Sequence, residues 1–241
     1  SRRSASSSPM DTAEAFDQPA CERESADLIV AHSDVVAHAE ALGRLHPLFA
    51  GLLARNGPPP LWRRHPSFQT LVRLVLEQQV SLASANAAFR RLEARVGNVT
   101  PSSVLESTDA QLKGDGFSRQ KAGYVRGIAH LILDGDFEPG TMPADATVSK
   151  QTLMSIRGIG PWTASCFLVF ALGLPDEWPR GDRALHVSMA RVMHLPSIPG
   201  SDDAESIASS WTPHRSTAAR MLWHDYLGGG SYVQAHDAGF L

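Results

Sequence analysis

The sequence predicts an all-α protein, and three observations lead to that fold class. Apolar residues recur at helical spacing along most of the chain, as at Phe68, Leu71, Val72, Val75 and Leu76. Ser, Thr, Gly and Pro residues punctuate these stripes at places typical of helix starts and stops. No segment shows the apolar–polar alternation of a half-buried strand. Helices joined by short turns therefore explain the pattern.

The composition argues against a membrane protein, a disulfide-rich scaffold and a cysteine-bound metal cluster. The 241 residues are 43% hydrophobic and 20% charged, which suits one large domain or two small ones. Cys21 and Cys166 are too few for a disulfide scaffold or a four-cysteine cluster, and the ten histidines show no metal-ligand spacing. No apolar run reaches the roughly 20 residues of a membrane span, and residues 1–10 lack the apolar core of a signal peptide. We therefore expect an intracellular protein, in the cytoplasm or bacterial nucleoid or in a nucleus, that does not span a membrane and uses no catalytic metal.

The first 65 residues divide into a tail, a helical stretch and a link. Residues 1–27 are rich in Ser, Ala and acidic residues without periodicity, which predicts a disordered tail or an expression remnant. Residues 28–55 have helical spacing with a break near His46 and Pro47, and three prolines at 58–60 form a stiff link. Residues 11–40 are strongly acidic and the chain from residue 41 onward is slightly basic, so the net charge of −3 neither excludes nor favours a nucleic-acid partner.

The helices expected between residues 66 and 135 are separated by capping residues. The first runs through Leu76 and is interrupted at Gln78-Gln79-Val80. The four helices that follow begin at Ser81 (closed by Gly97), Thr100-Pro101 (through Leu105), Thr108 (to Gly114) and Ser118 (to Gly135).

A glycine hairpin follows. Leu153 and Ile156 close one helix, Gly158-Ile159-Gly160 forms a tight turn whose glycines allow left-handed dihedrals, and Pro161 begins a second helix that ends at Gly173. Free backbone N–H groups at such a helix start bind a phosphate without sequence preference. A plain helical hairpin is the alternative interpretation.

A loop rich in Pro and Gly connects the hairpin to the next apolar helix and ends at Asp182. The carboxylate has two interpretations, a catalytic group or a helix N-cap. Asp176 and Glu177 lie earlier in the loop, where we expect solvated side chains.

The sequence here resembles the helix-hairpin-helix DNA glycosylase superfamily, in its 3-methyladenine DNA glycosylase II branch. The resemblance runs from about Leu45 to Trp223 and rests on three blocks in the right order: residues 77–81 (Glu-Gln-Gln-Val-Ser), residues 160–164 (Gly-Pro-Trp-Thr-Ala) and residues 211–216 (Trp-Thr-Pro-His-Arg-Ser). It implies a two-lobed all-α fold with the active cleft between the lobes. Residues 28–65 with 185–241 would form one lobe, and residues 66–184, including the hairpin at about 149–172 and the loop at 173–182, the other. The extra N-terminal α/β domain of some relatives is not expected.

The resemblance also assigns the chemistry. Asp182 matches the catalytic aspartate, whose carboxylate stabilises the positive charge that develops on the sugar or orients water. Trp162 stands where strand-cleaving relatives have a lysine nucleophile, and no lysine follows Lys150, so AP lyase activity is disfavoured. Arg215, in the last block, would either brace the fold or contact DNA.

Other positions take their roles from the same resemblance. Trp162 and Trp223 match aromatic residues of the base pocket, where an aromatic face attracts a cationic base; packing in the core is the alternative. Cys166 and His224 replace aromatic residues, which predicts a roomier or more polar pocket. Gln79 takes the place of the wedge that fills the gap left by a flipped base, with an exposed turn glutamine as the alternative. The DNA-binding group is Gly158, Ile159, Gly160, Thr163 and Gln79.

The prediction is a monofunctional glycosylase that flips and excises alkylated purines of the 3-methyladenine and 7-methylguanine type. Its partner would be double-stranded DNA with alkylated bases, bound by a monomer. The resemblance implies no cofactor other than a structural monovalent cation at the backbone carbonyls of Met154, Ile156 and Ile159. Two alternatives stay open: a glycosylase for another damaged or mispaired base, and a non-catalytic DNA-binding module, which would not need a carboxylate facing anionic DNA.

Overall fold

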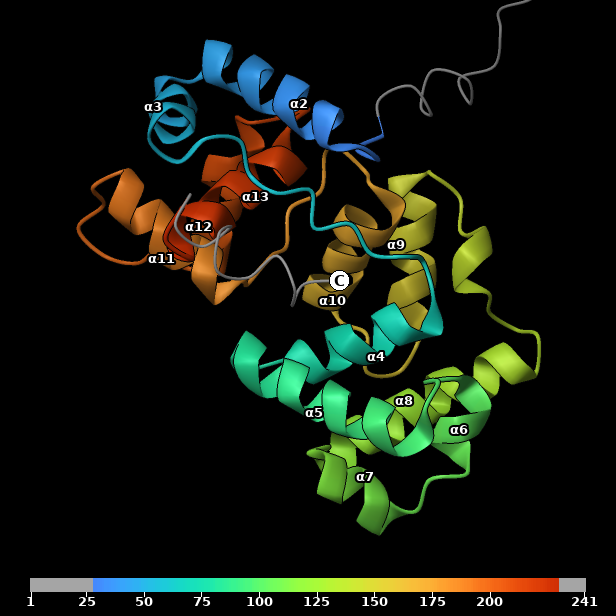
Figure 1. Ribbon diagram of the computed structural model, residues 1–241. Coiled ribbons are helices and arrows are strands. Elements are labelled where there is room, and N and C mark those ends of the chain that lie inside the picture. The colour runs from blue at the N-terminus through green and yellow to red at the C-terminus, as the bar shows by residue number, and fades with distance from the viewer. Residues whose placement is uncertain (1–27, 230–241) are drawn as a thin grey trace, which may run out of the picture.

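The computed structural model describes residues 28–229, and within them it contains helices and no strand. The predicted tail at 1–27 and the last twelve residues lie outside the described residues. The elements, of which Figure 1 labels the α-helices, are α2 (His32–Leu45), α3 (Pro47–Asn56), α4 (Phe68–Glu77), α5 (Leu82–Val96), α6 (Pro101–Leu105), α7 (Asp109–Asp115), α8 (Arg119–Leu133), η2 (Pro139–Thr141), α9 (Ala146–Ser155), α10 (Pro161–Phe167), η3 (Leu168–Leu172), α11 (Arg183–Val192), α12 (Ser201–Ser209) and α13 (Arg215–Tyr226). The predicted all-α class is confirmed.

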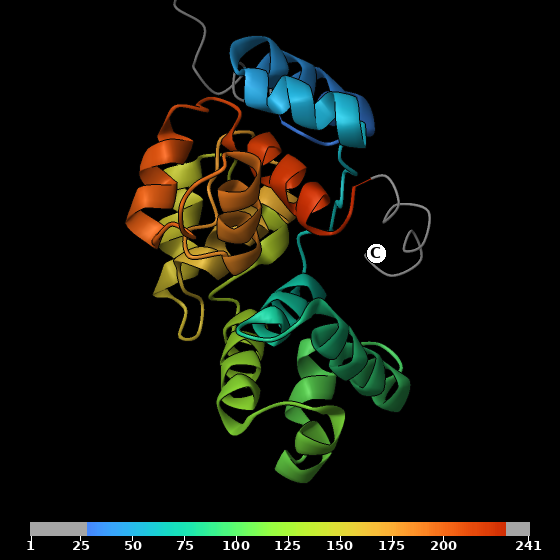
Figure 2. The ribbon, with the colours of Figure 1, turned by 90° about the vertical axis from the view of Figure 1, so that its left-hand side faces the viewer.

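The helices form two bodies, which Figure 2 shows one above the other. Helices α4 to α8 make the lower body, in which α4 packs on α5 and α8. In the upper body α13 packs on α2, α3 and α11. Helix α10 contacts both α9 and α4, so it lies where the two bodies meet. None of the helices between residues 28 and 229 is long and apolar enough to cross a membrane.

The capping residues explain why the predicted helices begin where they do. The side chains of Ser81, Thr100, Thr108 and Ser118 each accept a hydrogen bond from the backbone N–H three residues later. These bonds satisfy N–H groups that have no partner inside the helix. The four predicted starts are confirmed.

The second helix of the hairpin ends at Gly173, as predicted, but changes geometry on the way. α10 is α-helical to Phe167 and continues as the π-helical η3. Gly173 has a φ of 74° and its carbonyl accepts the Ile29 N–H at 2.7 Å. A Cβ on Gly173 would lie 2.5 Å from the Ile29 carbonyl oxygen, so this close approach requires glycine.

Candidate active site

Asp182 is the N-cap of α11, and both of its carboxylate oxygens are engaged. Oδ1 accepts the Leu185 N–H at 2.9 Å, and Oδ2 accepts the indole Nε1–H of Trp162 at 2.8 Å. The residue is 8% exposed. Two donors from two different helices therefore fix the orientation of this carboxylate.

The loop that leads to Asp182 is held to the hairpin by Glu177, whose carboxylate is buried. Its Oε2 accepts a hydrogen bond from Lys150 Nζ on α9 and another from Ser165 Oγ on α10, each at 2.9 Å. The Glu177 N–H donates to Ser216 Oγ at 2.9 Å. The expectation of a solvated Glu177 is wrong, because partners 12, 27 and 39 residues away satisfy it.

Asp176 is also paired rather than solvated. The Arg215 guanidinium donates from Nε to Oδ1 at 2.8 Å and from Nη2 to Oδ2 at 2.9 Å. The hydrogen bond with Asp176 raises the pKa of Arg215. Of the two roles considered for Arg215, the structure shows the brace: it ties the start of α13 to the loop before Asp182.

The two hairpin glycines differ. Gly158 has a φ of 95°, and a Cβ there would lie 2.2 Å from the Tyr124 ring. Gly160 has a φ of −92° and open space around its Cα, so the expectation of left-handed geometry is wrong at this position. Ile159, between them, is buried, and Thr163 Oγ1 accepts a hydrogen bond from the Gln78 side chain. Only Gly158 therefore needs glycine for the turn itself.

The predicted pocket residues are unequally exposed. Trp162 is half-buried, whereas Trp223 is 9% exposed and stacks on Phe170 with ring centroids 5.2 Å apart. Cys166 is fully buried on α10, and its pKa is raised by burial and by the charges of Asp182 and Glu77. Trp162, the donor to Asp182, is on the same helix as Cys166, and this helix contacts α4.

His224, the fourth predicted pocket residue, contacts another aromatic ring. It is buried, its ring faces the edge of Trp62 at 6.4 Å, and its Nε2 has no partner among the described residues. Burial lowers the pKa of His224. Of the four predicted pocket residues, the structure therefore connects Trp162 to Asp182 by a hydrogen bond.

Gln79 is exposed in the turn after α4, with a φ of 57°. Left-handed backbone is uncommon for a residue other than glycine and often marks a functional turn. Its role as a wedge stays a prediction.

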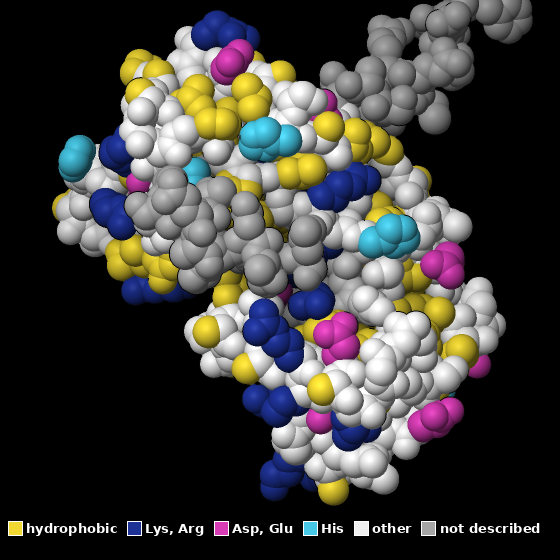
Figure 3. All heavy atoms as spheres, in the orientation of Figure 1, with side chains coloured by type: hydrophobic (Ala, Val, Ile, Leu, Met, Phe, Trp, Pro, Cys, Tyr) yellow, Lys and Arg dark blue, Asp and Glu magenta, His cyan; other side chains and the backbone are white. Residues whose placement is uncertain are grey.

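Figure 3 shows Lys and Arg side chains spread over the body formed by α4 to α8, on the face turned toward the viewer.

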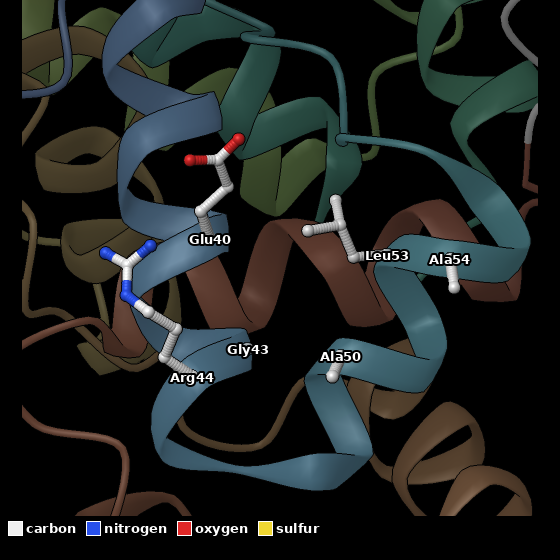
Figure 4. Close-up of a pocket in the computed structure, with 6 residues that line it drawn as sticks. All are labelled: Glu40, Gly43, Arg44, Ala50, Leu53 and Ala54. Atoms are coloured by element: carbon white, nitrogen blue, oxygen red, sulfur yellow. The ribbon is translucent and has the colours of Figure 1, made fainter.

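A separate shallow groove lies between α2 and α3, where Figure 4 shows Glu40 and Arg44 at its side and Ala50 and Leu53 opposite them. Glu40 and Arg44 are the charged residues that line it, and the other lining residues are Gly43, Ala50, Leu53 and Ala54. It is not part of the candidate active site.

The helical hairpin and the loop that ends at the fixed Asp182 carboxylate agree with the expected helix-hairpin-helix class. The sequence matches the family described as HhH-GPD superfamily base excision DNA repair protein over residues 72–214, and the chain belongs to this family.

Known proteins extend the likeness. The chain is 28% identical over 184 residues to the putative DNA-3-methyladenine glycosylase YfjP of Bacillus subtilis, which covers 72% of this chain and 64% of that protein. It is 24% identical over 206 residues to DNA-3-methyladenine glycosylase 1 of Schizosaccharomyces pombe, which covers 83% and 90% of the two chains. The solved structure of Mag1, the 3-methyladenine DNA glycosylase of Schizosaccharomyces pombe, in complex with abasic DNA matches with a TM-score of 0.69 and 25% identity, over 78% of this chain and 95% of that one.

Proposed function

We propose that this protein is a monofunctional DNA glycosylase that excises alkylated purines from double-stranded DNA as a monomer. The observation that carries the proposal is the Asp182 carboxylate, fixed by Trp162 and Leu185 beside the hairpin. Relatives named as 3-methyladenine glycosylases support the substrate class. The match to a complex with abasic DNA supports DNA as the partner.

The proposed reaction needs one charged group at the sugar. Cleavage of the N-glycosidic bond builds positive charge on the sugar, and a carboxylate held beside it stabilises that charge. Alkylation at N3 or N7 already makes the purine cationic, so the base departs without strong acid catalysis. Water then adds to the sugar cation, and the free base and an abasic strand are the products.

Strand cleavage through an amine is not part of the proposal. Trp162 occupies the position of the lysine nucleophile, and an indole forms no imine with the sugar. Lys150 is paired with Glu177, and Lys121 donates to the backbone carbonyls of Leu76 and Gln78 at the end of α4.

The hairpin also offers carbonyls for a monovalent cation. Met154 lies in the last turn of α9, where carbonyls have no partner within the helix, and Ile156 and Ile159 lie in the turn that follows, where the Ile156 carbonyl accepts the Ile159 N–H at 3.0 Å. Carbonyl oxygens suit a hard cation. We propose Met154, Ile156 and Ile159 as the ligands of a structural ion that stiffens the turn, with no part in the chemistry.

Product analysis on methylated DNA tests the proposal. The wild-type protein should release 3-methyladenine or 7-methylguanine as the free base, and borohydride added during turnover should trap no covalent adduct. Asp182→Asn should lose nearly all release while it still binds abasic-site DNA, because the binding surface is intact. Near-normal release by Asp182→Asn, or a trapped adduct, would overturn the mechanism.

A further inference from the structure

Gln78 connects the turn after α4 to the hairpin. Its side-chain Nε2 donates to the Gly158 carbonyl oxygen and to Thr163 Oγ1, both at 2.9 Å. The orientation of the amide is determined by the network, because the Gly158 carbonyl can only accept and must face the NH₂ group. One half-buried side chain therefore bridges segments that are 80 and 85 residues away.

Lys121 holds the same turn from the other side. Its Nζ donates to the carbonyl oxygens of Leu76 at 2.7 Å and Gln78 at 2.8 Å, and burial lowers its pKa. These carbonyls lie at the end of α4, where they lack partners within the helix. The Tyr124 ring, from the same helix as Lys121, packs against Gly158.

The two anchors leave the tip of the turn free. Gln79 and Val80 follow the anchored residues and are exposed, and Gln79 has a left-handed φ of 57°. Such a backbone costs about 1 kcal/mol and persists where the surroundings determine it. Here the Gln78 amide and the Lys121 ammonium group hold the residues immediately before Gln79.

We propose that Gln78 is a positioning residue for base flipping: it fixes the tip of the turn relative to the hairpin that holds the DNA backbone. The inference rests on the proposed function, in which the tip enters the base stack as the damaged base leaves. Without the two hydrogen bonds of Gln78, the tip of the turn becomes ordered only as the base flips. The free energy of ordering is then added to the flipping step and not to cleavage of the glycosidic bond.

Two DNA duplexes separate these steps. Each carries one 7-methylguanine, either paired with cytosine or placed opposite an abasic-site analogue, where the base is already unpaired. Gln78→Met keeps the volume and removes the donors. Its single-turnover release should fall about tenfold on the paired duplex, as expected for losing one or two hydrogen bonds, and less than twofold on the unpaired one. Lys121→Met should show the same selective loss.

Gln69→Ala is the matched control, because Gln69 is on the same helix and donates to Asn98 at its far end. It should release base from both duplexes like the wild type. An equal loss for Gln78→Met on the two duplexes, or no loss on either, would overturn the positioning role. Failure of the wild type to release base from either duplex would instead overturn the proposed function.

Discussion

Trp162 has a second role in the structure that the sequence does not predict. The sequence predicts that its aromatic face contacts a cationic base, and the structure shows that the N–H at the edge of the indole ring donates to Asp182 at 2.8 Å. A hydrogen bond to a charged group contributes about 1.5–3 kcal/mol, more than a cation–π contact at a partly exposed site. Trp162 is thus expected to act on the sugar chemistry through Asp182 as well as on the base.

Two substitutions at Trp162 distinguish the edge from the face. Trp162→Phe keeps an aromatic face and removes the N–H donor, so kcat should fall about tenfold on both 7-methylguanine and neutral hypoxanthine, with unchanged binding to abasic-site DNA. Trp162→Ala should in addition lose roughly 1 kcal/mol more on the charged base than on the neutral one. Wild-type kcat for Trp162→Phe would show that the hydrogen bond does not matter for catalysis.

At the same scale, sequence could predict a residue's role only where the residue itself carries the signal. Asp182 is noticeable because it ends a Pro/Gly loop before an apolar helix. Glu177 looks like any loop carboxylate, and its buried position depends on Lys150, Ser165 and Ser216, which no local pattern connects to it.

At the scale of elements, the sequence predicts a helix where a capping side chain close in sequence determines its end. The cap at Ser118, for instance, lies within three residues of the N–H that it accepts. The sequence does not predict α13, because its buried residues include Arg220, His224 and Asp225 and therefore form no apolar stripe. The π-helical turn of η3 has no signal in the sequence that we can identify.

The hairpin provides a matched pair of substitutions. Gly158→Ala must place a Cβ against Tyr124 at a φ of 95°, so it should weaken binding to all DNA sequences about equally and lower the thermal midpoint. Gly160→Ala has an ordinary φ and open space, so the fold should be unchanged. Any loss of DNA affinity by Gly160→Ala then reports contact with the backbone of DNA. Titration of undamaged duplex measures both, and unchanged affinity in both variants would make the hairpin structural only.

At the scale of the whole molecule, one carboxylate joins three helices of the upper body. Asp225 on α13 accepts hydrogen bonds from Arg55 Nη2 on α3 at 2.7 Å, and from Ser188 Oγ at 3.0 Å and Arg191 Nη2 at 2.5 Å on α11. Asn56 adds a fourth donor at 3.1 Å. Burial raises the pKa of Asp225, but the hydrogen bonds from Arg55 and Arg191 outweigh it and lower the pKa to about 2. This group joins three helices that are distant in sequence, and no sequence pattern predicts it.

The stability of the protein should therefore depend on pH through Asp225. A carboxyl group whose folded pKa of about 2 is below its unfolded value of about 3.9 stabilises the fold above the unfolded pKa and loses that contribution as pH falls toward the folded one. Asp225→Asn should lower the free energy of unfolding by about 2 kcal/mol near pH 7, a modest figure because both arginine partners are more than half exposed. The difference from the wild type should narrow between about pH 4 and pH 2, as the wild-type carboxylate is protonated.

Urea unfolding across this pH range measures the difference in the free energy of unfolding. The control is Asp134→Asn, which changes an exposed aspartate at the end of α8 and should keep wild-type stability. A difference that keeps its full size down to about pH 2.5 would mean that shape, not charge, accounts for the contribution of Asp225.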